Sequence, residues 1–181
     1  MGSNRRRPGA TLGLGPPVGE SWVWMTNVML SSITMRALSI HATRILAFLM
    51  ARHSETAGRR NGRLVASYRQ LKAWGLTGAD VRKGLEELYV TGFVRLTHQG
   101  LRVAGGGDAS EYALTWLPTM AGLAEGLPPT HDWQKVLKKL EVQRVGSVAA
   151  AKVWLKQECA AASRGAQRRA KLTARPQLKV V

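Results

Sequence analysis

The chain has one cysteine, no long apolar run and few acidic residues, and each shortage narrows what it can be. The single thiol, Cys159, excludes an intramolecular disulfide and a zinc site built on paired thiolates, and it suits a reducing cytoplasm. No apolar stretch approaches the roughly 20 residues that cross a bilayer. The cluster Arg5–Arg7 is followed by Pro and Gly, where a signal peptide would have an apolar region. We therefore expect a cytoplasmic protein with no membrane partner.

Groups that perform catalysis are also scarce. The four histidines fall on different expected elements, and no HExxH or paired-cysteine spacing occurs. The glycine run at 105–107 has no Lys-Ser or Lys-Thr after it, so it does not have the pattern of a phosphate-binding loop. We expect a protein without enzyme activity, cofactor, metal ion or small-molecule substrate.

Positive charge is abundant. Lysine and arginine number 27 against 11 aspartates and glutamates, a formal net charge of +16 that favours a polyanionic partner such as nucleic acid. An apolar share of 45% is enough to build a core. The pattern along the chain predicts a flexible basic arm (1–20), one domain (21–118), a linker (119–131), a basic helical extension (132–163) and a disordered basic tail (164–181).

The domain is most clearly patterned between residues 67 and 116. Ser67 is followed by Gln70, and Thr77 by Asp80, which is the capping-box spacing at the start of a helix. Gly75 lies between the two expected helices, where a residue with positive φ ends the first one. Alternating strands at 93–97 and 111–116 flank a long glycine-rich loop, and the short segment 63–65 fits a first strand that pairs with this hairpin.

Helix, turn, helix, strand, loop and strand in this order are typical of a winged helix-turn-helix, in which the long loop is the wing. We expect a mainly α protein with a small β-hairpin, of the α+β class. In the second helix, 77–91, the spacing of Val81, Leu85 and Leu88 directs all three toward the core. Tyr68, Leu71 and Trp74 are expected to form the apolar side of the first helix. Trp22, Trp24 and Trp116 are expected to lie in the core or at its edge.

The opposite face of helix 77–91 presents the candidate DNA contacts. Arg82 is suited to a bidentate pair with guanine and Lys83 to a phosphate, although a solvated helix face has the same composition. The full set of candidate contacts comprises helix starts, helix faces and the wing: Ser67, Arg69, Lys72, Thr77, Ala79, Arg82, Lys83, Glu86, His98 and Arg102.

Further helices are expected on both sides of the motif. Ser39 is placed to cap a long helix that runs to about His53, with Ile45, Phe48 and Leu49 on its buried face. Thr130 is placed to cap a helix at 132–144, and a second helical stretch covers 148–163.

Several stretches carry a resemblance to a known family. NGRL, the helix from Tyr68 to Gly75, ELYVTGF and YALTWLP, within about Trp22 to Trp133, resemble short winged helix-turn-helix proteins of alphaproteobacteria whose role is largely unknown. Their fold is similar to MarR-like and to plasmid or phage replication-initiator winged helices. The resemblance implies a winged-helix fold and DNA binding, and it implies no reaction and no site residue.

These patterns favour a non-catalytic protein that binds double-stranded DNA, used as a transcriptional regulator and associated with the bacterial nucleoid when bound. Replication or maintenance of a plasmid, phage or other mobile element stays open, as does a homodimer on symmetric half-sites. From other classes, a winged-helix adaptor for protein partners and an RNA-associated basic protein are also compatible with the sequence.

Overall fold

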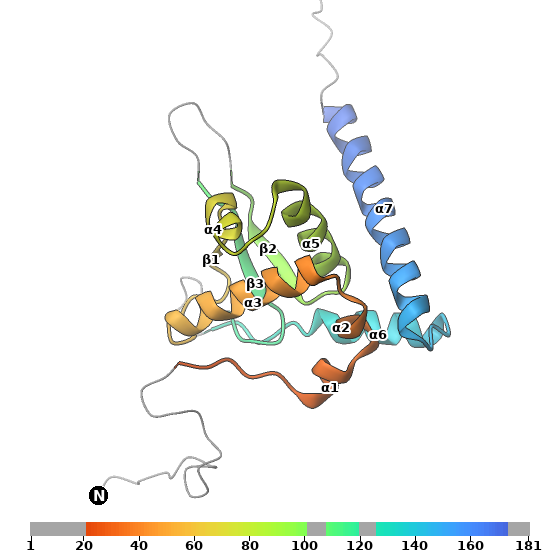
Figure 1. Ribbon diagram of the computed structural model, residues 1–181, viewed down its shortest axis with the longest axis horizontal. Coiled ribbons are helices and arrows are strands. Elements are labelled where there is room, and N and C mark those ends of the chain that lie inside the picture. Colours follow the sequence, from red (N-terminus) through yellow and green to blue (C-terminus); the bar gives the residue numbers. More distant parts are fainter. Residues whose placement is uncertain (1–20, 101–107, 120–125, 174–181) are drawn as a thin grey trace, which may run out of the picture.

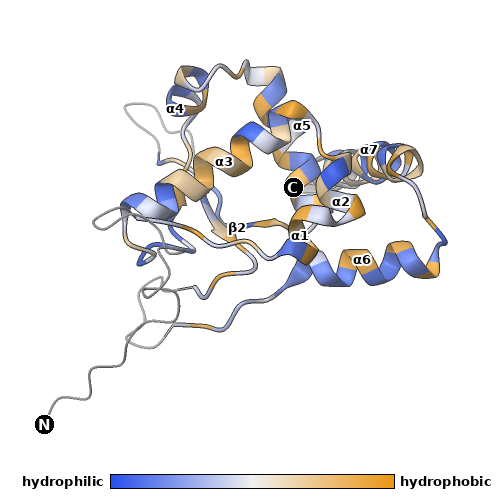
Figure 2. Ribbon diagram, turned by 60° about the horizontal axis from the view of Figure 1, so that its bottom comes forward, coloured by the Kyte–Doolittle hydropathy of each residue, from blue (hydrophilic) through white to orange (hydrophobic). Residues whose placement is uncertain are grey.

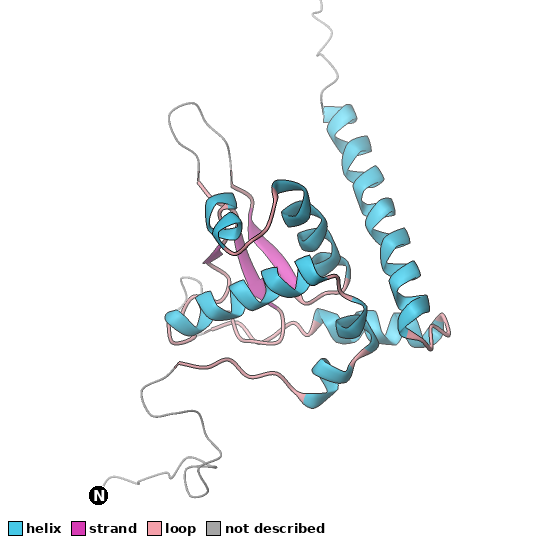
Figure 3. Ribbon diagram, viewed as in Figure 1, coloured by secondary structure: helices cyan, strands magenta, loops and turns pink. Residues whose placement is uncertain are grey.

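The computed structural model describes residues 21–100, 108–119 and 126–173, with the backbone alone for 168–173. Within these ranges the elements follow in the order drawn in Figures 1 and 3: α1 (Asn27–Ser31), α2 (Ile33–Ala37), α3 (Ile40–Glu55), β1 (Leu64–Val65), α4 (Tyr68–Ala73), α5 (Gly78–Val90), β2 (Val94–His98), β3 (Glu111–Leu114), α6 (Asp132–Val142) and α7 (Val148–Thr173).

The strands form one small antiparallel sheet. Its order is β1-β3-β2, so the first strand pairs with the far strand of the hairpin, Leu64 opposite Tyr112, and β2 pairs on the other side, Val94 opposite Leu114. This confirms the predicted class, a mainly helical chain with a small antiparallel sheet. It also confirms the pairing expected for the segment before Ser67.

Helix α3 forms the centre of the core. Ser39 caps it as predicted, accepting a hydrogen bond from the amide of Ala42, and Ile45, Phe48 and Leu49 are buried. Figure 2 shows the middle of α3 coloured as hydrophobic. Helix α3 packs across α5 at Gly84, where a Cβ atom would lie 2.7 Å from Ile45 Cδ1 and 3.0 Å from the backbone nitrogen of Ala42. The two helices therefore meet backbone to backbone.

The tryptophan prediction is wrong at two of three positions. Trp116 is fully buried and donates its ring N–H to the carbonyl oxygen of Trp24 at 2.9 Å. Trp22 and Trp24 are 58% and 41% exposed, because the chain before α1 is non-helical and alternates, so that Val23 and Met25 pack against the core instead.

The apolar side predicted for α4 is also narrower than expected. Leu71 is buried, but Tyr68 and Trp74 are 56% and 44% exposed. Helix α4 has only six residues, so it turns a single large side chain inward. Trp74 still contacts the core edge-on, with its ring centroid 5.3 Å from that of Phe48.

The C-terminal extension belongs to the same core. Trp133 and Leu140 of α6 are buried, and the Trp133 ring stacks on Phe93 at 6.3 Å. The cap prediction for α6 is wrong: the residue at the N-cap is His131, in a left-handed conformation without a side-chain cap, whereas the Thr130 hydroxyl bonds to the Asp132 carboxylate.

Helix α7 packs on α2 and α5 through Ala151, Trp154 and Leu155, and its C-terminal end projects past α5 (Figure 1). The tail predicted as disordered from 164 is helical to Thr173. The cause is composition, since Ala, Arg, Lys and Gln, which fill most of 164–171, favour helix. In the part of the chain that the structure describes, no helix is both long and apolar enough to cross a membrane.

Candidate nucleic-acid interface

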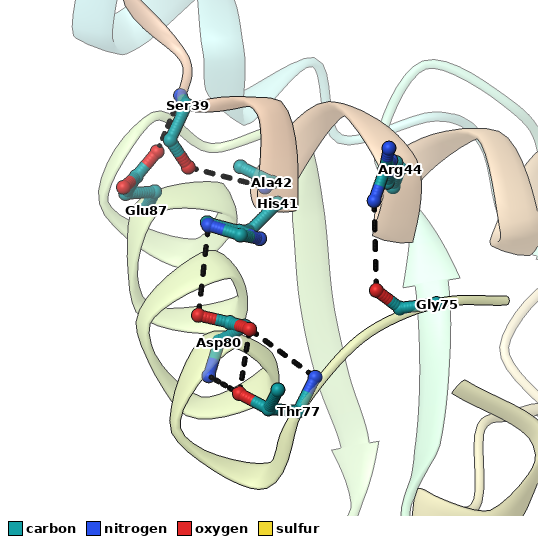
Figure 4. Close-up of polar contacts among 8 residues, drawn as sticks. All are labelled: Ser39, His41, Ala42, Arg44, Gly75, Thr77, Asp80 and Glu87. Carbon is teal, nitrogen blue, oxygen red and sulfur yellow. Dashed lines mark hydrogen bonds and ion pairs between the residues drawn. The ribbon is translucent and has the colours of Figure 1, made fainter. Parts of the chain in front are cut away.

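Two adjoining helices, α4 and α5, have tightly fixed starts. Ser67 and Gln70 form a complete capping box, and so do Thr77 and Asp80, as their spacing predicts. Gly75 has φ +80°, a left-handed conformation that a side chain would strain, and it turns the chain from α4 into α5. Figure 4 shows this corner, with the Thr77 and Asp80 side chains pointing toward one another. Local hydrogen bonds therefore fix the residues at which both helices begin.

Packing then decides which side of α5 is open. Val81 and Leu88 are buried at 2% and 0% exposure, as predicted, and Leu85 is half-buried at the edge of the core. On the other side, Ala79, Arg82 and Lys83 are exposed. The first two turns of α5 thus present one small and two cationic side chains to solvent; we call these three residues the open face.

The Asp80 carboxylate, beside the open face, is held chiefly by Thr77 and also attracts Lys83. The Asp80 carboxylate accepts hydrogen bonds from the Thr77 hydroxyl and amide, at 2.5 and 3.2 Å, and lies 3.5 Å from His41 Nε2. Chiefly because of the Thr77 hydrogen bonds, the pKa of Asp80 is lowered from 3.8. Neither Arg82 nor Lys83 forms an ion pair with any residue that the structure describes.

Helices α4 and α3 add further cations beside this corner. Arg69 and Lys72 are exposed on α4. Arg44 of α3 is exposed too, and its guanidinium lies 3.5 Å from the carbonyl oxygen of Gly75 (Figure 4). This contact joins residues 31 positions apart, so no local pattern in the sequence indicates it.

Glu86 does not lie on the open face, contrary to its expected position. It is half-buried, and its carboxylate accepts a hydrogen bond from the Ser163 hydroxyl of α7 at 3.1 Å. Its neighbour Glu87 accepts a hydrogen bond from the backbone N–H of Ser39 at 2.8 Å, at the start of α3. Both carboxylates therefore hold α5 to other helices and leave the open face to the cations.

The loop that the sequence predicts as a wing is described only at its base. His98, at the end of β2, is exposed and pairs through its ring with the Asp108 carboxylate. Arg102, the other predicted wing contact, lies outside the described residues.

Among the residues that the structure describes, no three His, Cys, Asp or Glu side chains come together as metal ligands. Comparison of the chain with protein-family models, with curated proteins and with solved structures returned no match.

Proposed function

We propose that this chain is a winged helix-turn-helix protein that binds double-stranded DNA, without catalysis, through the open face of α5. The observation that carries the proposal is that Arg82 and Lys83 are exposed and form no ion pair with the described part of the chain, while the opposite side of the same helix is buried. A helix held this way can enter a major groove with its cations foremost.

The order of elements supports this reading. Helix α3, strand β1, helices α4 and α5 and the hairpin β2–β3 follow one another as in a winged helix, and the sheet order β1-β3-β2 places the first strand at the edge beside β3. In such a fold the helix that precedes the turn crosses the DNA backbone. Arg69 and Lys72 of α4 are exposed for phosphate contacts of that kind, and Arg44 adds a third cation next to the turn.

Each side chain then has a separate role. Arg82 is proposed to read a guanine, a bidentate contact that contributes roughly 1–3 kcal/mol of discrimination against the wrong base. Lys83 is proposed to hold a phosphate, and Ala79 leaves room for the groove floor to approach the helix. Ser67 and Thr77, whose hydroxyls are used as caps, lie where backbone phosphates would pass.

The test is the salt dependence of binding to a short random DNA duplex, measured by fluorescence anisotropy. Wild-type affinity is expected to fall steeply between about 50 and 200 mM salt, with a log–log slope of roughly −0.9 per phosphate contacted. The double variant Arg82→Ala, Lys83→Ala should bind at least about tenfold more weakly and show a slope shallower by about one to two units, with flattened sequence preference.

Arg59→Ala, Arg60→Ala is the matched control, since these two exposed, adjacent arginines lie in the turn after α3 and carry the same charge. Equal losses in both double variants would mean that net charge alone attracts the duplex, and would retire the open face of α5 as the binding surface.

The same assay separates the alternatives. Duplex RNA bound as tightly as duplex DNA would favour an RNA-associated protein, because the deep, narrow major groove of A-form RNA does not admit a helix of this kind. No binding to either duplex would favour an adaptor for protein partners. If the chain binds DNA, we propose that it regulates transcription. Selection of bound genomic fragments distinguishes this role from replication or maintenance of a mobile element.

A further inference from the structure

A groove of about 600 Å³ lies behind the open face, where the junction of α2 and α3, helix α5 and helix α7 meet. This volume falls within the range of roughly 300–1,000 Å³ that holds a small organic molecule. Three separate parts of the chain form its walls, so the groove exists only while α7 stays packed against α5 and α2. None of the candidate DNA contacts except Lys83 and Glu86 lines it.

One wall of the groove is apolar. Leu38 and Leu155 are buried beneath it, Ile40 is 60% exposed along its rim, and Cys159 is half-buried. Burial raises the pKa of the Cys159 thiol to about 11, and the nearby glutamates add to the shift, so the thiol stays protonated and acts as a small apolar group. This wall suits an aromatic ring or a branched aliphatic body.

The polar lining is cationic in effect. Lys83, Lys152 and Lys156 are exposed at the groove and form no ion pair with any described residue. The lining also holds Glu86 and Glu87, which keep their negative charge while they accept hydrogen bonds from the Ser163 hydroxyl and the Ser39 amide. The three ammonium groups outnumber the two carboxylates, so the lining has a formal charge of +1 and favours an anion over a cation.

We propose that this groove binds a small organic anion with an apolar body, such as an aromatic or branched aliphatic carboxylate, as an effector of DNA binding. The basic N-terminal arm of the chain is a poor occupant, because its arginine cluster would face three lysines. A bound anion draws Lys83 toward the groove and away from the open face. The ligand therefore weakens DNA binding, a coupling that rests on the proposed function.

The first test uses anilinonaphthalene sulfonate, a fluorescent aromatic anion, as the probe, and contains no DNA. Saturable binding to the wild-type chain is expected, and Lys152→Gln, Lys156→Gln should weaken it roughly tenfold or more, since both charge-assisted contacts are lost. The control Arg59→Gln, Arg60→Gln removes the same charge outside the groove and should stay within about twofold of wild type. Equal affinity in the two double variants would overturn the site.

A second probe isolates the anionic group. N-phenylnaphthylamine has the same rings without the sulfonate, so it should bind much more weakly than anilinonaphthalene sulfonate. Binding of the neutral probe as tightly as the anion would show a merely apolar surface and would overturn the proposal.

The third measurement tests the coupling to DNA. Saturating anilinonaphthalene sulfonate should weaken duplex binding several-fold in the wild type and leave it unchanged in Lys152→Gln, Lys156→Gln. In the absence of the probe, Lys152→Gln, Lys156→Gln should bind DNA with the same affinity as the control Arg59→Gln, Arg60→Gln. If its DNA affinity instead fell as far as that of Arg82→Ala, Lys83→Ala, the groove lysines would be phosphate contacts, and the effector role would be overturned. If DNA binding itself fails, the charge-dependent binding of the probe still decides whether the site exists.

Discussion

The two halves of α5 differ in how much of the molecule holds them. The first half is held by the Thr77–Asp80 capping box and by burial of Val81 and Gly84, and its other side shows the open face to solvent. The second half is held from several directions, by the Ser39 amide, by Ser163 of α7 and by burial of Leu88. One helix thus divides into a presenting half and an anchored half, so stability and binding should respond to different substitutions.

The largest change in the free energy of unfolding is expected when a side chain of the anchored half is truncated. Leu88→Ala should lower the free energy of unfolding by about 2–5 kcal/mol, because a fully buried leucine leaves a cavity. Arg82→Ala, Lys83→Ala should change the same quantity by no more than about 0.5 kcal/mol, since both residues are exposed. Urea unfolding followed by circular dichroism measures both.

A second truncation serves as the control for burial. Leu96→Ala removes the same atoms from β2, where the leucine is 38% exposed, and should lower the free energy of unfolding clearly less than Leu88→Ala does. If the arginine–lysine variant unfolded as easily as Leu88→Ala, the division of α5 into two halves would be wrong.

A smaller effect is expected at the start of the presenting half. Thr77→Ala removes the oxygen that accepts a hydrogen bond from the Asp80 amide, and should lower the free energy of unfolding by about 1 kcal/mol. Thr43→Ala, an exposed threonine inside α3, is the control and should be neutral or slightly stabilising, because alanine is the better helix former. A loss at Thr43 equal to that at Thr77 would argue against a capping role.

The smallest effect concerns pH. The pKa of Asp80 is below 3.8 in the folded chain, chiefly because of the hydrogen bonds from Thr77, so the ionised carboxylate stabilises the fold at pH values above 3.8. This contribution is lost as the pH falls through the lowered value. Asp80→Asn should therefore be less stable than wild type at neutral pH and approach it in acid, as measured by urea unfolding at several pH values. Glu141→Gln, on the exposed side of α6, is the control with the same change of charge. A wild-type profile that Asp80→Asn reproduces in full would contradict the prediction.

Local patterns explain what could be predicted. Both capping boxes, the turn at Gly75 and the buried positions Val81 and Leu88 follow from residues a few positions apart, and the structure confirms them. The same reasoning placed the three strand segments, because alternation and glycine are signals of short range.

Contacts between distant parts of the chain could not be predicted in this way. The carboxylate of Glu86 was expected on the open face and instead bonds to Ser163, 77 positions away. Asn61 is fully buried: its side-chain NH2 donates to the carbonyl oxygen of Leu114, and its side-chain oxygen accepts a hydrogen bond from the Leu114 amide, 53 positions away. The exposed rings of Trp22 and Trp24 show the opposite error, since hydrophobicity alone does not reveal which side of a short segment meets the core.

Gly84, at the crossing of α3 and α5, gives the presented side chains a fixed direction. With no side chain between the two backbones, α5 lies directly against the main chain of α3, so close that a Cβ atom at Gly84 would be 3.0 Å from the backbone nitrogen of Ala42. In the DNA complex that we propose, this close contact would hold the backbone at Arg82 in place. The adjustment on docking would then fall to the nucleic acid, so sequences that bend or widen easily should be preferred even at positions that no side chain touches.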